Sequence, residues 1–359
     1  ALGPHARAFD PQELKTRMEE LHNYFVGVGI RFKRIKGEYT VVLPLPSSGA
    51  EKAGIKSGDV ILEADGKVLN GQDFDVVKDM LRGPVNSSVT VKVRRPGTEE
   101  PFDVAIVRSP VSTSSVAYTS ILGDGQTGFI RIEDFASETP AHLRNAVGDL
   151  LKAGATRLVI DLRHNPGGLL TSGTGCADIF IQDGTIVTMR AGRGEHKKDT
   201  VFSATAENTV TDLPLAVLID GRSASAAEIF AAAMKDHDRA VIVGSKSYGK
   251  GTVQSTYEDG LAGFALKFTT ALFYSPKGTK IQDNGIVPDL EVKQTEEEFN
   301  ISLLIYDIAE TRRHLPGYYP EVLDALEITE ESLSDPVADA AAKLLAGEPQ
   351  PVPDAGGVE

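Results

Sequence analysis

The sequence predicts an α/β protein made of two parts, a small β-rich unit followed by a larger core. Residues 25–110 contain five short strand-like runs and one helical pattern. From residue 127 onward, strand and helix patterns alternate, which favours parallel strand pairing. Two runs, 157–162 and 215–220, are apolar throughout, as in strands that are buried on both faces of a sheet. The length of 359 residues fits two domains or slightly more.

The β-rich unit is predicted to span 25–110 and to follow an N-terminal helical segment, 1–24, that packs with the core. An amphipathic pattern predicts a helix over 9–24, and a glycine-rich turn then leads into a strand within 25–32. The single helix of the unit ends at Gly83, a residue type that readily adopts the left-handed conformation after a helix. That helix is expected over 73–83, and further strands over 39–45, 59–66, 88–95 and 102–108.

The core is predicted to span 111–293. Its strands are expected at 128–132, 157–162, 215–220, 239–244, 266–276 and 286–292, and its helices at 141–154 and 225–235. An acidic helical segment, 294–345, follows the core. The tail, 346–359, is rich in proline and glycine, which predicts disorder.

The composition excludes several classes of protein. The net charge of −14 argues against nucleic-acid binding, which usually requires a basic surface. Cys176 is the single cysteine, so it forms no intramolecular disulfide and is interpreted as a buried thiol. The seven histidines show no HxxxH pair, so we expect no metal site and no cofactor. The sequence contains no run of about 18 apolar residues, so no membrane-spanning helix is predicted.

Ser225 is the first candidate for chemistry. A buried strand ends at Asp220, a loop of small residues follows, and Ser225 opens a helix. The free N–H groups and positive dipole of a helix N-terminus stabilise developing negative charge. Taken alone, however, Ser225 with Glu228 three residues later fits an ordinary capping box.

Lys250 is the second candidate and lies in the glycine-rich segment VGSKSYGKGTVQS, 243–255. The spacing from Gly244 to Lys250 resembles a phosphate-binding loop, but Gly251 stands where Ser or Thr would bind magnesium, and a strand pattern follows instead of a helix. A nucleotide site is therefore rejected. A surface lysine in a turn remains the alternative when this loop is considered alone.

A third segment, Asn-Pro-Gly-Gly at 165–168, follows the buried strand 157–162. Glycines allow a backbone N–H to point at a ligand, as an oxyanion site requires, although a turn with positive φ has the same signature. Parallel strands bring this turn and Ser225 to the same sheet edge.

A serine nucleophile needs a base, and neither His164 nor His237 has an obvious orienting acid in the sequence. Lys250 serves if its amine is neutral, which requires an apolar pocket such as Phe268 and its strands could provide.

The motifs SASAAE, GKGTVQ, DLRHNPGG and ALKFTTALFYSPKG together resemble the carboxyl-terminal processing proteases, over roughly residues 9–345. The resemblance implies a ClpP/crotonase-like α/β peptidase core with Ser225 as nucleophile, Lys250 as base and Gln254 positioning the lysine. It also implies an oxyanion hole formed by the N–H of Ala226 and by Gly167 or Gly168, between which the sequence does not choose. Ala227 departs from the family's SASAS, and GPHARAF departs from its N-terminal pattern.

The unit at 25–110 resembles the PDZ domain that the family carries as an insertion, and AGIKSGDVILEADG matches that domain's signature. The resemblance implies that a substrate C-terminus binds as an added strand. The residues expected to form its site are Gly27, Val28, Gly29, Ile30, Phe32, Val77 and Leu81. Arg82, in LRG, occupies the position of a residue that couples the PDZ domain to the active site in some relatives; a helix-terminal cation is the alternative.

From the resemblance we expect an endopeptidase that cleaves proteins near their C-termini, with the PDZ domain recognising that terminus and gating activity. The alternative is an inactive PDZ-containing scaffold of the same fold. Expected partners are protein substrates, an activating adaptor and further copies of the chain. We expect a periplasmic or cell-envelope location with the export signal absent from this sequence, and the thylakoid lumen as second choice.

Overall fold

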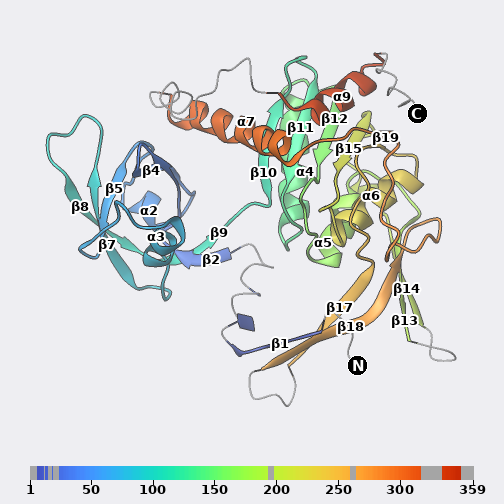
Figure 1. Ribbon diagram of the computed structural model, residues 1–359, viewed down its shortest axis with the longest axis horizontal. Helices are drawn as coiled ribbons and strands as arrows, with labels where there is room; N and C mark the ends of the chain where they lie inside the picture. Colours follow the sequence, from blue (N-terminus) through green and yellow to red (C-terminus); the bar gives the residue numbers. More distant parts are fainter. Residues whose placement is uncertain are drawn as a thin grey trace, which may run out of the picture. The chain divides into compact units, whose positions relative to one another are not determined.

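The computed structural model describes residues 6–11, 13–14, 18, 24–192, 198–258, 264–316 and 334–348 (Figure 1). The chain forms two compact units, and neither is continuous in sequence. The first comprises residues 1–23, 114–295 and 335–359, and the second comprises residues 24–113 and 296–334. Each unit is described by itself.

The first unit is built on a six-stranded sheet with the order β10-β11-β12-β15-β16-β19. Five neighbouring strands are parallel, and β10 pairs antiparallel with β11 at one edge. The central strands are buried throughout, as their continuous apolar sequences predict. The bounds are β10 Val116–Ile121, β11 Thr127–Ile132, β12 Arg157–Asp161, β15 Leu215–Ile219, β16 Val241–Gly244 and β19 Leu290–Glu291.

Helices surround this sheet and form the main hydrophobic core with it (Figure 1). Three of them, α4 (Thr139–Lys152), α5 (Leu170–Asp178) and α6 (Ala226–Asp236), contact one another in succession, and α9 (Pro336–Leu345) contacts β12, β15 and β16. The sequence prediction missed α5, because its two glycines disfavour a helix. The need for a glycine is clear at Gly173. A Cβ there would lie 3.1 Å from the Cβ of Ala226, so the glycine lets α5 approach the start of α6.

A second, antiparallel sheet completes the first unit, with the order β1-β18-β13-β14 and β17 paired to β18. Its long strand β18 (Ala265–Tyr274) and β17 (Thr252–Tyr257) agree with the predicted strand patterns. The hairpin of β13 (Thr185–Ala191) and β14 (Lys198–Ser203) was not predicted. Strand β1 (Arg7–Phe9) pairs with β18, and most of the helix expected over 9–24 lies outside the described residues.

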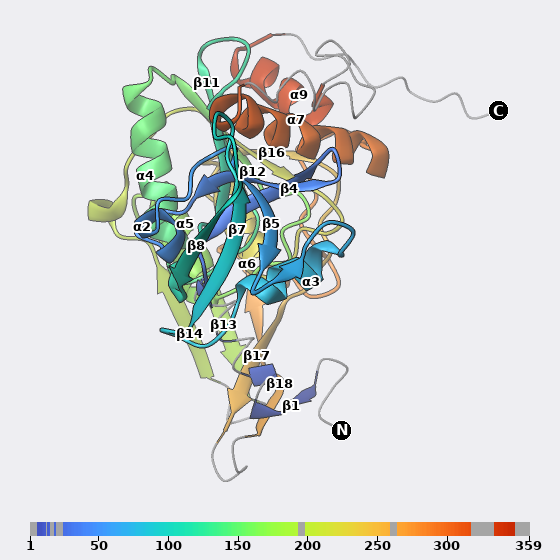
Figure 2. The same cartoon turned by 90° about the vertical axis from the view of Figure 1, so that its left-hand side faces the viewer.

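The second unit has a sheet of order β3-β4-β5-β7-β8, with β6 paired to β5, and a separate pair β2-β9 (Figure 2). The sheet and helix α3 enclose a core that includes Tyr39, Val41 and Val77. The bounds are β2 Tyr24–Gly27, β3 Ile30–Ile35, β4 Glu38–Pro44, α2 Gly49–Lys52, β5 Val60–Ala64, β6 Lys67–Val68, α3 Phe74–Leu81, β7 Ser88–Arg94, β8 Phe102–Val107 and β9 Ser109–Ser112.

The C-terminal helical segment expected over 294–345 divides between the two units. Helix α7 (Glu296–His314) belongs to the second unit, where Leu315 packs with Ile35 and Val42. Helix α9 belongs to the first unit. The expected tail lies mostly outside the described residues, and no helix in the described part of the chain is long and apolar enough to cross a membrane.

Two acidic residues, the buried Asp161 and the exposed Asp124, make the first unit sensitive to acid. Burial raises the pKa of Asp161, but Arg163 and Arg131 lower it more, to about 2. Burial likewise raises the pKa of Asp124, and hydrogen bonds from Thr127, Gln126 and Arg157 lower it to below the ordinary range. Each carboxylate therefore stabilises the fold above its unfolded pKa, and this contribution is lost as the pH falls through the folded value.

We expect the urea midpoint of the protein to fall as the pH decreases from about 4 toward 2, because over this range the unfolded chain binds protons at both carboxylates while the folded protein keeps them largely ionised. The Asp124→Asn variant should be less stable at pH 7 and should lose less stability on acidification. Urea unfolding followed by circular dichroism at several pH values measures both effects. An identical pH dependence in the two proteins would contradict the role of Asp124.

Candidate active site

Ser225 lies at a strained turn between a strand and a helix. Strand β15 ends at Ile219, and α6 begins one residue after Ser225. Ser225 has φ 56° and ψ −114°, a conformation that non-glycine residues rarely adopt. Such strain persists only where surrounding contacts hold it, and it is typical of nucleophile turns between a strand and a helix.

Glu228 is the contact that holds this turn. Its side chain is fully buried in the first turn of α6, and its Oε2 accepts the Ser225 N–H at 2.9 Å. The same atom accepts the Lys250 N–H at 2.8 Å, while Oε1 accepts the Gly249 N–H and the Ser247 hydroxyl, both at 2.6 Å. One carboxylate therefore fastens the backbone of both candidate catalytic residues. The capping role predicted for Glu228 accounts for only one of these bonds.

Lys250 and Gln254 lie on the loop and strand that follow Ser247. Gln254 sits at a register shift between β17 and β18, and bulges of this kind redirect side chains. Its Nε2 donates to Thr269 Oγ1 at 2.8 Å and to Thr252 Oγ1 at 3.2 Å, but its Oε1 is buried without a partner. Within the described residues, no hydrogen bond joins the half-buried Lys250 amine to the Ser225 hydroxyl or to Gln254.

The two candidate oxyanion glycines have different environments. Gly167 has φ 95°, and a Cβ on it would lie 2.7 Å from Ser225 Cβ and 2.8 Å from the Ala226 nitrogen. Its own N–H donates to Asn165 Oδ1 at 2.8 Å. Gly168 is held against Phe135, whose carbonyl would lie 2.2 Å from an added Cβ. Among the described residues, the N–H groups of Gly168 and Ala226 have no hydrogen-bond acceptor.

Asn165 connects the glycine turn to the serine turn. It is fully buried, and its Nδ2 donates to the Ile132 carbonyl at the end of β11. Its carbonyl accepts the Ala224 N–H at 2.9 Å, and its Oδ1 accepts the Gly167 N–H. The sequence analysis noted Asn165 only as part of the turn, since no local pattern shows that its bonds reach three separate segments.

One of the two histidines has an acidic partner that the sequence did not show. His164 does have an acidic partner, because its Nε2 lies 3.1 Å from Asp220 Oδ2 and its N–H donates to Asp220 Oδ1. The sequence did not show this partner, because 56 residues separate the two. His237 Nε2 contacts the Thr185 carbonyl at 2.7 Å. In the described part of the chain, neither ring forms a hydrogen bond with the Ser225 hydroxyl.

The second unit contains an apolar groove of about 200 Å³ between the start of β3 and helix α3. Of the expected peptide-binding residues, Val77 is fully buried behind the groove, and Gly27 pairs with Ser109. The N–H of Val28 donates to the Leu81 carbonyl at 3.3 Å, whereas that of Gly29 has no acceptor among the described residues. The groove is lined by Phe25, Val28, Gly29, Ile30, Arg31, Phe32, Phe74, Lys78, Leu81 and Arg82.

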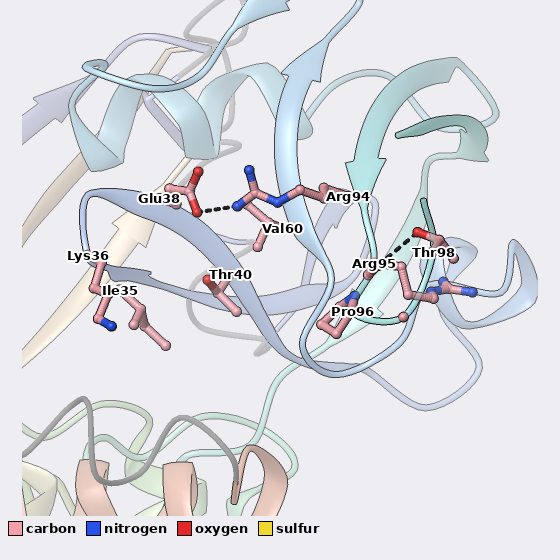
Figure 3. A pocket seen from close by; sticks show the side chains of 10 residues that line it. Ile35, Lys36, Glu38, Thr40, Val60, Arg94, Arg95, Pro96 and Thr98 are labelled. Carbon is pink, nitrogen blue, oxygen red and sulfur yellow. Dashed lines mark hydrogen bonds and ion pairs between the residues drawn. The ribbon is translucent and has the colours of Figure 1, made fainter. Parts of the chain in front are cut away.

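A second hollow in this unit, of about 430 Å³, is lined by both charged and apolar side chains (Figure 3). Arg94 forms an ion pair with Glu38, and Arg95 forms a two-point ion pair with Asp59 at 2.7 Å. These pairs satisfy the two guanidinium groups, so we assign no ligand to the hollow. Among the described residues, no group of three or more His, Cys, Asp or Glu side chains is placed to bind a metal ion.

Comparison with known proteins gives matches to both units. Residues 126–292 match peptidase family S41, and residues 40–95 match the PDZ domain. The chain is 36% identical to the carboxy-terminal-processing protease of Bartonella bacilliformis over 97% of its length and 81% of that protein. It is 34% identical to a probable CtpA-like serine protease of Staphylococcus saprophyticus, over 81% of this chain and 58% of that protein.

A solved structure agrees with this fold. The putative S41 protease of Bacteroides fragilis matches 96% of this chain and 87% of its own, with a TM-score of 0.51 and 16% identity. The fold and these matches define a serine-type peptidase that carries a PDZ domain. The chain belongs to peptidase family S41 and, within it, to the carboxy-terminal-processing proteases. The resemblance found in the sequence is therefore confirmed.

Replacing Glu228 with Gln should disturb both candidate catalytic residues at once, because an amide cannot accept all four hydrogen bonds. We expect kcat/KM to fall about 100-fold, as a displacement of about 1 Å can cause. The unfolding free energy should fall by about 3 kcal/mol because buried donors lose their acceptor. Hydrolysis of an unstructured protein and thermal unfolding measure the two effects.

The matched control is Glu138→Gln, which changes an exposed glutamate at the start of another helix of the same unit. It should leave both quantities unchanged. Wild-type activity in the Glu228→Gln variant would show that the carboxylate does not organise the site.

Proposed function

We propose that this peptidase cleaves protein substrates near their C-termini with a Ser/Lys dyad. Ser225 is the nucleophile, Lys250 is the general base and Gln254 orients the lysine. The observation that carries the proposal is the Glu228 carboxylate, whose Oε2 accepts the backbone N–H groups of both Ser225 and Lys250. Strain at Ser225 is the second support, because it exposes the hydroxyl at a sharp turn.

The chemistry follows from these positions. Ser225 Oγ attacks the substrate carbonyl carbon while its proton moves to the neutral Lys250 amine. The resulting oxyanion accepts hydrogen bonds from backbone N–H groups, and Lys250 returns the proton to the leaving amine as the peptide bond breaks. Water then attacks the acyl-enzyme, with Lys250 again accepting a proton, and releases Ser225.

The free backbone donors favour one of the two candidate glycines. Gly167 donates its N–H to Asn165, so we assign the oxyanion donors to Gly168 and Ala226, whose N–H groups have no acceptor in the described part of the chain. Gly167 has a different function in this proposal: only a residue without a Cβ lets the turn lie against Ser225 and Ala226.

The dyad closes when substrate binds. The Lys250 amine and the Gln254 Oε1 form no hydrogen bond with each other, and the buried Oε1 has no partner. In this proposal, substrate binding brings the Lys250 amine to Ser225 and to the Gln254 Oε1, which then gains a donor. Catalytic hydrogen bonds are often incomplete before substrate binds.

The groove of the second unit is the proposed binding site for the substrate C-terminus. An extended peptide beside β3 would place its carboxylate near the free N–H of Gly29, with Lys78 and Arg82 supplying positive charge. Phe32 and Phe74, whose rings stack with centroids 4.9 Å apart, form an apolar wall for the terminal side chains. In this proposal, occupation of the groove gates the dyad, and Arg82 is the coupling candidate.

Ser225→Ala and Lys250→Ala should each abolish cleavage of an unstructured protein such as casein. Thermal stability should stay within about 1 kcal/mol of the wild type, because Lys250 forms no ion pair among the described residues and the Ser225 side chain contributes only to the cap of α6. Cleavage is measured by gel electrophoresis over hours, and stability by thermal unfolding. Substantial activity in either variant would refute the dyad.

C-terminal recognition predicts that amidating the substrate C-terminus lowers kcat/KM about 10-fold, because the groove loses its carboxylate contacts. Phe74→Ala should weaken cleavage of the free-carboxylate peptide and reduce this discrimination. Val76→Ala, an exposed change on the same helix outside the groove, is the control. Equal rates for both peptides with the wild type would exclude this role of the groove.

A further inference from the structure

Arg163 joins the glycine turn to the C-terminal helix of the first unit. It lies two residues after the end of β12 and two residues before the turn, and its side chain is almost fully buried, with 1% exposed. Its guanidinium forms a two-point ion pair with Asp161, with both N···O distances 2.9 Å. It forms a second two-point pair with Asp335, at 2.8 and 2.6 Å.

Arg163 also contacts both ends of one excursion of the chain. The chain leaves the first unit after residue 295, contributes α7 to the second unit, and returns to the first unit at Asp335. Gln294, at the point of departure, accepts a hydrogen bond from Arg163 Nη1 at 3.0 Å. Asp335, at the point of return, forms the ion pair and also caps α9 through the Ala338 N–H.

Among the described residues, this buried network joins two arginines to two carboxylates, and one of the carboxylates caps α9. Arg131 and Arg163 carry two positive charges, and Asp161 and Asp335 carry two negative charges. Removing one member of a buried ion pair leaves an uncompensated charge, which is strongly unfavourable. Without Asp335, Arg163 would lose a two-point ion pair while its guanidinium stayed buried, which favours movement of its side chain toward water.

Movement of Arg163 would reach the glycine turn through a short path. Asn165, two residues later, forms the bonds that hold Gly167 and Ala224 in position. The position of Asn165 depends on the chain leaving β12 with the Arg163 side chain directed inward. The glycine turn that begins at Asn165 then orients the Gly168 N–H.

We propose that Arg163 is a positioning residue that keeps the oxyanion donors in place only while Asp335 of α9 is bound to it. The consequence is that the return of the chain from the second unit is a condition for activity in the first. This inference rests on the proposed function, because it assigns the glycine turn a part in catalysis.

The test compares Asp335→Asn with Asp124→Asn in the full chain. Asparagine still caps α9, so the first change removes the charge and leaves the helix start intact. Asp124 pairs with Arg157 near the amino ends of β11 and β12 and serves as the matched control. Hydrogen exchange of the segment 162–169 and the kinetic constants for a peptide substrate are measured for both, well below their melting temperatures.

For Asp335→Asn we expect exchange in 162–169 to rise at least about 10-fold as this segment opens locally. We expect kcat to fall about 10- to 100-fold, because oxyanion donors act mainly in the transition state, with KM changed less than about 2-fold. Asp124→Asn should leave exchange in 162–169 and kcat near wild type.

Gln294→Ala removes one neutral hydrogen bond to Arg163. It should change exchange and kcat in the same direction as Asp335→Asn but by a smaller factor. It replaces Asp335→Asn in the test if that variant does not fold.

Unchanged exchange and kcat in the Asp335→Asn variant would overturn the proposal. So would equal losses of kcat in the Asp335 and Asp124 variants, since general destabilisation would then explain both. If Ser225→Ala retained activity, the proposed function would fail. The exchange measurement would still report whether Asp335 holds the turn.

Discussion

The organisation of the candidate site depends on the buried carboxylate of Glu228. A buried charge is stable only when polar groups surround it, and here four donors from two segments do so. The same requirement draws the loop at Ser247–Lys250 onto the first turn of α6. Ser247 extends the arrangement, since its Oγ also accepts the Ile286 N–H. Because the buried Glu228 carboxylate requires these hydrogen bonds, the same bonds also hold Ser225 in its strained backbone conformation.

Local patterns predicted the strands and most helices of the core because each is encoded by nearby residues. The apolar runs of β12 and β15 identified buried parallel strands, and the small residues around Ser225 identified the turn. Helix α5 was missed because its glycines serve contact with α6 rather than helix propensity. The hairpin of β13 and β14 was missed because its pairing is decided by neighbouring strands.

The sequence identified the candidate residues of the site but not the hydrogen bonds and ion pairs that hold them together. Local sequence identified Ser225, Lys250 and the glycine turn as candidates, and the resemblance to the protease family gave them and Gln254 their expected roles. The comparisons establish the family without testing these individual roles. The tie between His164 and Asp220, and the bonds of Asn165, join segments far apart in the chain. No local pattern specifies such contacts. The choice between Gly167 and Gly168 likewise required knowing which N–H already has an acceptor.

The distance along the chain between Arg163 and Asp335 has a consequence for biosynthesis. The two residues are separated by 172 positions, and ribosomes add about 5–20 residues per second. For about 10 to 35 s, therefore, a nascent chain has made Arg163 but not its partner. Ser225 is translated between these two residues, so a chain that already contains the proposed nucleophile still lacks Asp335. Under the proposal that Arg163 positions the oxyanion donors, the active site is complete only once translation has passed α9.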